Sequence, residues 1–263
     1  MKELKILYLY PDLLELYGDF GNIQVLRYRL EKRGIKASIT PYSIGDEAPN
    51  FSDYDLVFAG GGADQEQGIL ADDLIKYKDN IKEAVDNGVF FLLICGAYQL
   101  FGKYYKGVEG NIIPGLEVFP YYTEAIADRK KRCIGNIVIS TILDGKETKI
   151  IGFCNHGGQT YDIDTPFGDV LYGKGNKFGD NKEGFFLDNV IATYLHGPLL
   201  SKNPELTDYI ITHCLKRKYK DEDIKLESLD DSFENLCREQ LLNRFLSEEN
   251  KWHYYLYYNY SQY

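Results

Sequence analysis

The sequence lacks the net positive charge that is common in proteins that bind nucleic acids or anionic membranes. Its 263 residues include 30 Lys and Arg against 40 Asp and Glu, which gives a formal net charge of −10. This balance argues against a nucleic-acid partner, for which a basic patch is expected, and against docking on an anionic membrane. No apolar run approaches the ~18 residues of a membrane span, and the N-terminal stretch has no signal-peptide pattern. We therefore expect a cytoplasmic protein without membrane insertion.

Paired cysteine motifs and phosphate-binding motifs are missing as well. The five cysteines are an odd number and include no C-x-x-C pair, which argues against a disulfide framework and against a four-thiolate zinc site. The glycines at 60–62 are followed by no Gly-Lys-Ser/Thr, so they form no Walker loop, and no G-x-G-x-x-G fingerprint occurs. We predict that this chain itself holds no metal and no cofactor.

What the sequence does contain is an alternation of apolar runs and helical patterns. Continuous apolar runs at 4–10, 55–59 and 89–94 are typical of strands that are buried on both faces. A helical pattern follows the first run, with Asn22 as the expected N-cap, and another lies at 69–87. This alternation predicts an α/β fold, an open and mostly parallel sheet with helices on both faces.

From about residue 107 the pattern changes to short β-rich segments separated by glycine-rich turns. We interpret these segments as a second, partly antiparallel part of the same sheet; they are 134–142, 150–154, 170–172 and 190–194. After Pro204 the pattern is that of charged helices, and the sequence ends in many tyrosines. We expect one domain over residues 1–205. Residues 206–263 are expected to form a C-terminal helical extension and aromatic tail, packed on the same domain or on a partner.

Cys95 carries the clearest chemical signal in the sequence. A buried strand runs straight into it, and Gly96 to Gly102 has the pattern of a helix start. A nucleophile on such a strand-to-helix turn is raised above the sheet edge, and the next backbone amide can donate to an oxyanion. The helix N-terminus also favours thiolate over thiol. The competing interpretation is a plain buried cysteine, which is common.

A cysteine nucleophile needs a base, and the chain has only four histidines. His196 and His156 each follow a predicted strand, so either could reach the same rim of the sheet. We take His196 as the first candidate and His156 as the second. His213, on a predicted helix, is expected to be structural, and His253, in the aromatic stretch, is expected to be incidental.

Gly60, Gly61 and Gly62 directly follow the predicted strand 55–59. Glycines at this place let backbone N–H groups turn toward a substrate oxygen. The alternative is a tight turn, and three glycines alone do not decide between the two.

Several short segments that bear chemical groups stand in a fixed order along the chain. They are Tyr17-Gly-Asp-Phe-Gly-Asn22, Phe58-Ala-Gly-Gly-Gly-Ala-Asp-Gln-Glu-Gln67, Cys95-Gly-Ala-Tyr-Gln99, Tyr122-Thr-Glu124, Asn155-His-Gly-Gly-Gln-Thr160, Tyr172-Gly-Lys-Gly-Asn176 and Thr193-Tyr-Leu-His-Gly-Pro198. Together they resemble the class I glutamine amidotransferases of the CobB/CobQ-like type, which have a flavodoxin-like fold. The likeness is closer still to the GatD-like glutamine-hydrolysing subunits of lipid II isoglutaminyl synthases, and it covers about residues 4–205.

This resemblance implies a role for each of the candidate residues. Cys95 would attack the side-chain amide of glutamine, and His196 would first help ammonia to leave and then activate water. Glutamate would be released from a γ-glutamyl thioester. The backbone amides of Gly96 and of Gly61 or Gly62 would form the oxyanion hole.

The resemblance also implies an arginine that binds the glutamine substrate. In GatD-like proteins this arginine precedes a strand of the pattern Gly-Asn/Asp-Ile-Val-Ile, which selects Arg132 here. Arg129 is a nearby alternative, because the loop is a few residues longer. A guanidinium suits a substrate carboxylate through a bidentate fork.

The sequence departs from the pattern of the classical class I enzymes at two places. Leu93 and Ala97 replace the glycines of G-x-C-x-G around the cysteine, and Pro198 stands where a glutamate follows the histidine. CobB/CobQ-like proteins share the second departure. Either a cysteine–histidine dyad suffices, or a carboxylate comes from elsewhere, such as the synthetase partner.

The resemblance further implies a partner, because a glutaminase of this type feeds ammonia to a synthetase. For a GatD-like chain that partner is a MurT-like synthetase of the Mur ligase family, in a heterodimer that amidates the D-glutamate α-carboxylate of the lipid II stem peptide. ATP and Mg²⁺ would be bound by the partner. The alternatives are a glutaminase of a cobyric-acid-type (corrin) amidation system, a cysteine hydrolase of γ-glutamyl substrates or peptides, and a non-catalytic binding subunit.

Overall fold

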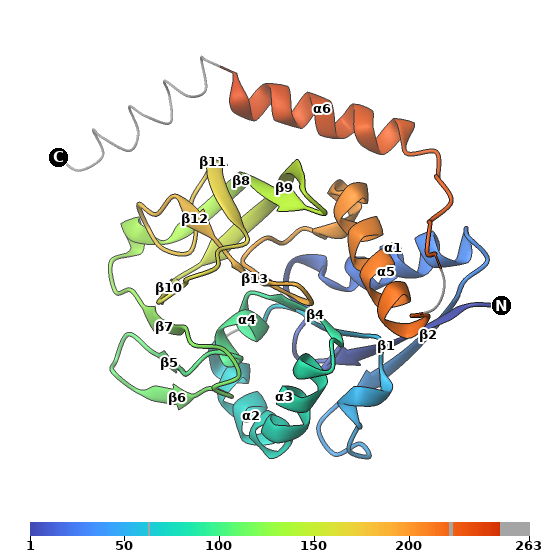
Figure 1. Cartoon of the computed structure of the whole chain (residues 1–263). Helices are drawn as coiled ribbons and strands as arrows, with labels where there is room; N and C mark the ends of the chain where they lie inside the picture. The colour runs from blue at the N-terminus through green and yellow to red at the C-terminus, as the bar shows by residue number, and fades with distance from the viewer. Residues whose placement is uncertain (63, 221–222, 248–263) are drawn as a thin grey trace.

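A six-stranded sheet forms the centre of the computed structural model, which describes residues 1–62, 64–220 and 223–247 (Figure 1). The strand order is β13-β14-β4-β3-β1-β2, and all neighbours are parallel except β13 and β14. The central strands β3 and β4 consist of buried residues only, as expected for strands covered on both faces. The strands are β1 (Glu3–Leu9), β2 (Lys36–Tyr42), β3 (Leu56–Ala59), β4 (Phe90–Ile94), β13 (Phe185–Leu187) and β14 (Val190–Thr193).

Helices cover both faces of this sheet, which confirms the predicted fold class. Figure 1 shows α1 and α5 together over one face and α2 and α3 over the other. The helices are α1 (Phe20–Glu31), α2 (Asp64–Leu74), α3 (Lys78–Asp86), α4 (Gly96–Leu100), α5 (Pro204–Lys218) and α6 (Ser232–Leu246). Single turns of 3-10 helix are η1 (Leu16–Gly18), η2 (Phe51–Asp53), η3 (Ile75–Tyr77), η4 (Arg129–Lys131) and η5 (Leu200–Lys202).

Two details of the helix predictions were wrong. The helix expected at 69–87 is divided into α2 and α3 by the turn η3. Asn22 is not an N-cap, because α1 begins two residues earlier, at Phe20. The Asn22 side chain is fully buried and its Oδ1 accepts a hydrogen bond from the backbone N–H of Leu200 at 2.9 Å. Its short polar side chain thus joins α1 to a distant turn instead of closing its own helix.

The strands between residues 104 and 183 form two further sheets, so the prediction that the segments 134–142, 150–154 and 170–172 extend the central sheet was wrong. The predicted segment 190–194 does belong to the central sheet, as β14. One sheet has the order β10-β7-β5-β6 and the other the order β12-β11-β8-β9. The central sheet ends at β13, which pairs with β14 and covers that edge. The strands are β5 (Tyr104–Lys106), β6 (Ile112–Pro114), β7 (Tyr122–Ala125), β8 (Cys133–Leu143), β9 (Lys146–His156), β10 (Gly158–Tyr161), β11 (Gly168–Tyr172) and β12 (Lys182–Glu183).

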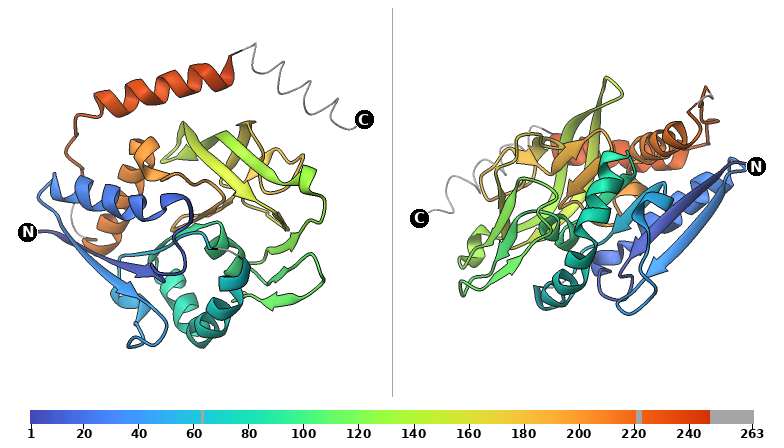
Figure 2. Two further views of the ribbon diagram at one scale, coloured as in Figure 1. Left: turned by 180° about the vertical axis from the view of Figure 1, so that it is seen from behind. Right: turned by 60° about the horizontal axis from the view of Figure 1, so that its bottom comes forward.

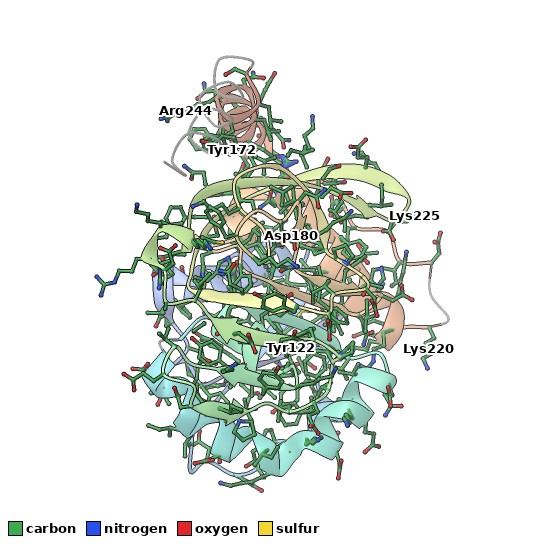
Figure 3. The ribbon with its side chains drawn as sticks, turned by 90° about the vertical axis from the view of Figure 1, so that its left-hand side faces the viewer. Tyr122, Tyr172, Asp180, Lys220, Lys225 and Arg244 are labelled. Atoms are coloured by element: carbon green, nitrogen blue, oxygen red, sulfur yellow. The ribbon has the colours of Figure 1, made fainter. Side chains whose placement is uncertain are left out.

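The two C-terminal helices differ in how they meet the rest of the molecule. Helix α5 has Leu206, Ile210 and Ile211 in the main hydrophobic core, so the predicted domain boundary at residue 206 falls inside a core helix. Helix α6 runs along the outside (Figure 2) and has a single buried residue, Phe245. The Phe245 ring stacks on Tyr172 with 5.2 Å between centroids, at the end of the molecule where Figure 3 labels Tyr172 beneath the helix. The aromatic tail predicted beyond α6 lies outside the described residues.

A buried arginine joins α1, α5 and the segment that leads to α6. The guanidinium of Arg29, 4% exposed, donates to both oxygens of Asp208 and to both oxygens of Asp231. Because its fork geometry is satisfied on both sides, this arginine can be buried without an unpaired charge. The contact fixes where the chain turns toward α6.

Candidate active site

Cys95 stands on a sharp turn between strand and helix, as its sequence predicts. Strand β4 ends at Ile94 and helix α4 begins at Gly96, and Cys95 between them has φ +50° and ψ −101°. Its backbone N–H donates to the carbonyl of Thr193 at 2.8 Å, which ties the turn to the end of the neighbouring strand β14. A non-glycine residue in this left-handed region costs on the order of 1–3 kcal/mol, and such strain clusters at functional sites. The turn places the thiol at the carboxyl edge of the central sheet.

His196 reaches the same edge from β14. The residue is fully buried, and its backbone N–H donates to Phe153 O at 2.8 Å while its carbonyl accepts from Phe153 N at 3.1 Å. A Cβ placed on Gly61 would lie 2.7 Å from His196 Cε1 and 3.3 Å from Cys95 Cβ. The predicted nucleophile, Cys95, and the predicted base, His196, therefore lie close together, and only a glycine fits at position 61 between them.

The carboxylate that the sequence lacks after His196 is supplied by Asp19, within the same chain. Asp19 Oδ2 lies 3.0 Å and Oδ1 3.2 Å from His196 Nδ1, and both side chains are fully buried. Because Nδ1 faces this carboxylate, it is the nitrogen that carries a proton. The ring's other nitrogen, Nε2, is buried without a hydrogen-bond partner among the described residues, and it is the one left for the Cys95 side chain.

The sequence analysis missed Asp19, although it quoted the segment Tyr17–Asn22 as part of the resemblance. The two residues of this contact are 177 positions apart, so no local spacing could have indicated it. A tight approach of the two segments makes it possible. A Cβ on Gly21 would lie 2.2 Å from Pro198 Cγ, so Gly21 lets the start of α1 pack directly on the turn after His196.

The charge state of His196 follows from its two neighbours. Burial opposes the charged imidazolium, but the Cys95 thiolate and the Asp19 carboxylate outweigh it and hold the pKa of His196 well above its ordinary value. An opposite charge within a few ångströms favours the charged form most strongly where water is excluded. The arrangement therefore favours the charged imidazolium form of His196.

The glycine loop after β3 packs so tightly that side chains are excluded. A Cβ on Gly60 would lie 2.2 Å from the carbonyl oxygen of Leu14. The N–H of Gly61 donates to Asp19 Oδ2 at 2.9 Å, so this amide is used to hold the carboxylate. Gly62 N lies 2.9 Å from the position of a Cβ on Gly96. Of the two candidates in this loop, Gly62 is the one whose amide stands beside Gly96 and is not taken by Asp19.

A cavity of about 530 Å³ opens beside Cys95. One side consists of the parallel-sheet rim, with Gly62 and Cys95, and the other of the antiparallel strands, with Arg132 and Asn155. Arg132 Nε donates to Asn155 Oδ1 at 3.0 Å. Arg129, in the exposed turn η4, does not line this cavity. The structure thus brings Arg132, not Arg129, to the space next to the thiol.

His156 also lines the cavity, but its surroundings differ from those of His196. It is 2% exposed, its Nδ1 donates to Gly158 O at 2.6 Å, and its ring stacks on Tyr194 with 3.6 Å between centroids. Burial lowers the pKa of His156 to about 3. It is therefore a neutral, fixed imidazole. His213 packs against Tyr209 with 4.4 Å between ring centroids, and His253 lies outside the described residues.

A buried glutamate of the antiparallel part supports the segment that leads to His196. Glu183 is fully buried, and its carboxylate accepts from Thr193 Oγ1 at 2.9 Å and from Tyr194 N at 2.8 Å. Burial raises the pKa of Glu183 to about 7. The antiparallel sheets thus hold the end of β14 in place as well as forming a wall of the cavity.

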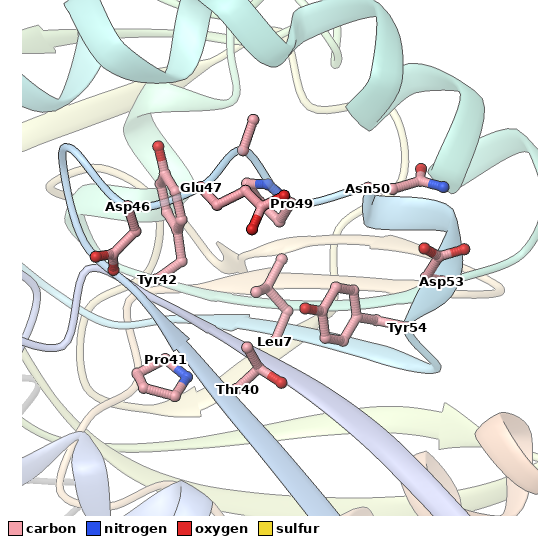
Figure 4. A pocket seen from close by; sticks show the side chains of 11 residues that line it. Leu7, Thr40, Pro41, Tyr42, Asp46, Glu47, Pro49, Asn50, Asp53 and Tyr54 are labelled. Carbon is pink, nitrogen blue, oxygen red and sulfur yellow. The ribbon is translucent and has the colours of Figure 1, made fainter.

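A second cavity of about 360 Å³ lies at the end of β2 (Figure 4). Its polar lining includes Asp46, Glu47 and Asp53, and it contains no histidine or cysteine. Within the described parts of the chain, no cluster of three or more His, Cys, Asp or Glu side chains could hold a metal ion. No helix among these residues is long and apolar enough to cross a membrane.

The chain is similar in sequence to known proteins over most of its length. Residues 5–204 match the CobB/CobQ-like glutamine amidotransferase domain. The chain is 42% identical to the lipid II isoglutaminyl synthase (glutamine-hydrolyzing) subunit GatD of Staphylococcus aureus, over 83% of this chain and 87% of that protein. It is 41% identical to the subunit of the same name of Streptococcus pneumoniae, over 87% and 86%. A probable cobyric acid synthase of Methanocaldococcus jannaschii is 31% identical over 60% of this chain and 32% of its own length.

The family match spans the central sheet, both antiparallel sheets and the start of α5. It includes the strand-to-helix turn of Cys95 and the histidine segment that meets it. This chain belongs to the CobB/CobQ-like glutamine amidotransferase family and is a glutamine-hydrolysing enzyme of the α/β class.

Proposed function

We propose that this chain is the glutaminase subunit of a lipid II isoglutaminyl synthase. The single observation that carries the proposal is the buried Cys95–His196–Asp19 arrangement, in a chain 42% identical to a GatD subunit over most of both lengths. Ammonia released here would pass to a MurT-like synthetase of the Mur ligase family, which holds ATP and Mg²⁺. The pair would amidate the D-glutamate α-carboxylate of the lipid II stem peptide.

The proposed reaction begins with the thiolate of Cys95. Its Sγ attacks the side-chain carbonyl carbon of glutamine and forms a tetrahedral oxyanion, which the amides of Gly62 and Gly96 stabilise by hydrogen bonds. His196 then donates its Nε2 proton to the amide nitrogen. The C–N bond breaks, ammonia leaves, and a γ-glutamyl thioester remains on Cys95.

The second half of the reaction uses the same groups in reverse. Neutral His196 takes a proton from water, and the hydroxide attacks the thioester carbonyl. The C–S bond breaks, glutamate leaves and the thiolate returns. Asp19 keeps the imidazole in the tautomer and orientation that this cycle needs, and it stabilises the imidazolium. Arg132 would hold the substrate α-carboxylate through its guanidinium.

Glutamate release from L-glutamine tests the nucleophile. We expect Cys95→Ala to lower kcat by about 10⁴-fold or more, because the covalent route is lost. The matched control is Cys154→Ala, since Cys154 is a buried cysteine of β9 outside the cavity. Equal release by the Cys95→Ala variant and the wild type would overturn the assignment, and so would activity on γ-glutamyl peptides without activity on glutamine.

Lipid II amidation tests the partner and the acceptor. The chain with a Mur-ligase-type synthetase, ATP, Mg²⁺ and glutamine should amidate lipid II, whereas the purified chain alone should not. Ammonium salt should restore amidation to the complex that carries Cys95→Ala, because the synthetase then needs no glutaminase. Amidation by the chain alone, or amidation of a corrin acceptor in place of lipid II, would contradict the proposal.

A further inference from the structure

Tyr17 connects the two walls of the cavity. It lies in the turn η1, has φ +58°, and is 44% exposed. Its ring meets the His196 ring edge to face, with 4.8 Å between centroids. Its hydroxyl contacts Asn155 on the opposite wall, and both residues line the cavity. A half-exposed tyrosine held in a strained backbone conformation indicates that its position serves the site.

The donors and acceptors in this contact have only one consistent assignment. Arginine is a donor only, so Arg132 Nε must face the carbonyl oxygen of the Asn155 amide, at 3.0 Å. The Asn155 Nδ2 group then faces Tyr17 and donates to its hydroxyl oxygen at 2.6 Å. The Tyr17 hydroxyl is thus an acceptor in this bond, and its own hydrogen is left over. Among the described residues, no group accepts that hydrogen.

The Tyr17 hydroxyl hydrogen is available in the cavity lining, and the Asn155 amide links this hydroxyl to Arg132. Because Arg132 donates its Nε–H to Asn155, its two terminal nitrogens are left for a ligand. A carboxylate has two oxygens with about four lone-pair sites in total, so it can accept from a guanidinium and from a hydroxyl together. Asn155 orients both donors, because its oxygen faces one of them and its nitrogen faces the other.

We propose that the Tyr17 hydroxyl is a substrate contact that donates a hydrogen bond to the α-carboxylate of glutamine held by Arg132. This inference rests on the proposed function, and it adds a second donor to the carboxylate site. Tyr17, Asn155 and Arg132 then act as one unit that selects an amide bearing an α-carboxylate. The same tyrosine touches His196, so the residue that binds the remote end of the substrate also packs on the base.

The experiment compares Tyr17→Phe with wild type in the glutaminase–synthetase complex. The variant keeps the ring against His196 and removes only the hydroxyl. We expect KM for L-glutamine to rise about tenfold with kcat nearly unchanged, as for the loss of one hydrogen bond to a charged group. With L-glutamine α-amide, which has no carboxylate, the two proteins should have equal KM. The matched control is Tyr28→Phe, an exposed tyrosine of α1 outside the cavity, with no change expected for either substrate.

Asn155 supplies a second test. Asn155→Ala should raise KM for L-glutamine at least as much as Tyr17→Phe, because it frees both donors. In the double variant of Tyr17→Phe and Asn155→Ala, the fold increase in KM should be smaller than the product of the two single increases, since both residues act on one carboxylate. An increase equal to that product would mean that the two residues act independently, which contradicts the proposal.

The outcomes separate this inference from the function on which it rests. If glutamate release needs Cys95 and Arg132 but Tyr17→Phe leaves KM unchanged, the hydroxyl contact is wrong and the glutaminase assignment stands. If Tyr17→Phe raises KM equally for glutamine and its α-amide, Tyr17 acts through His196 and not on the carboxylate. If release does not need Cys95, the proposed function itself fails.

Discussion

Two buried histidines, His156 in the lining of the cavity and His196 beside Cys95, have pKa values that are shifted in opposite directions. Burial opposes the charged form of both, but His196 faces Cys95 and Asp19, and the pKa of His196 is raised. His156 faces a backbone carbonyl and a tyrosine ring, and burial lowers the pKa of His156 to about 3. Burial alone makes a histidine neutral, and charged partners at close range reverse that result.

The two walls of the cavity also differ in the chemical groups that they carry. The parallel-sheet rim carries Cys95 and His196 at strand ends, with Asp19 directly before α1 in contact with His196. The antiparallel wall carries Arg132 and Asn155 toward the cavity and a neutral His156 behind them. Proton transfer is assigned to the rim and recognition of the substrate to the wall. The predictions that follow test this division.

Removing the Asp19 charge should have the largest effect on the rim. We expect Asp19→Asn to lower kcat for glutamate release by about 10³- to 10⁴-fold, because the amide can no longer favour the protonated Nδ1 or stabilise the imidazolium. Steady-state kinetics in the complex measures it. The matched control is Asp188→Asn, which removes the charge of an exposed aspartate outside the cavity. A loss below about tenfold would mean that another carboxylate, such as one from the partner, orients His196.

Removing the Arg132 charge should have a smaller effect, and on a different constant. Arg132→Ala should raise KM for glutamine by about 100-fold and leave kcat within a few fold, because a bidentate ion pair to the substrate is lost. Arg129→Ala, three residues away in the exposed turn η4, serves as the control and should behave as wild type. If Arg129→Ala raises KM and Arg132→Ala does not, Arg129 and not Arg132 binds the substrate carboxylate.

The smallest effect concerns stability and pH at His156. Its pKa is about 3 in the folded chain and ~6.5 when unfolded. Between these values the unfolded chain binds a proton that the folded chain cannot bind. The free energy of unfolding therefore falls as pH decreases through this window, by up to about 1.4 kcal/mol per unit.

Urea unfolding of wild type and His156→Gln between pH 7 and 5 measures this contribution. The glutamine does not titrate, so its curve should fall less steeply, while carboxylates contribute equally to both and cancel. Parallel curves would show that the pKa of His156 is the same in the folded and the unfolded chain, and that burial does not lower it.

The sequence analysis found those features of the site that are local in the chain. An apolar run that ends at Cys95-Gly96 is enough to predict a strand-to-helix turn, and the run before His196 predicts the same edge. Arg132 was implied by the resemblance, because GatD-like proteins have an arginine before this strand, and Arg129 remained an alternative. Asp19 and Tyr17 were not found, because their roles exist only after the loop that follows β1 meets His196 and Asn155. No spacing in the sequence encodes that meeting.

The sequence by itself determined the layered α/β class, the strand ends and the residues that stand on them, since apolar periodicity and glycine position act over a few residues. Only the tertiary structure decided that the strands between residues 104 and 183 form separate sheets, that Asp19 contacts His196 beside Cys95, and that His156 is neutral. These depend on backbone approaches such as that of Gly21 to Pro198 and on which charges share a water-free space. Such contacts arise from packing between segments far apart in the chain, which local preferences do not specify.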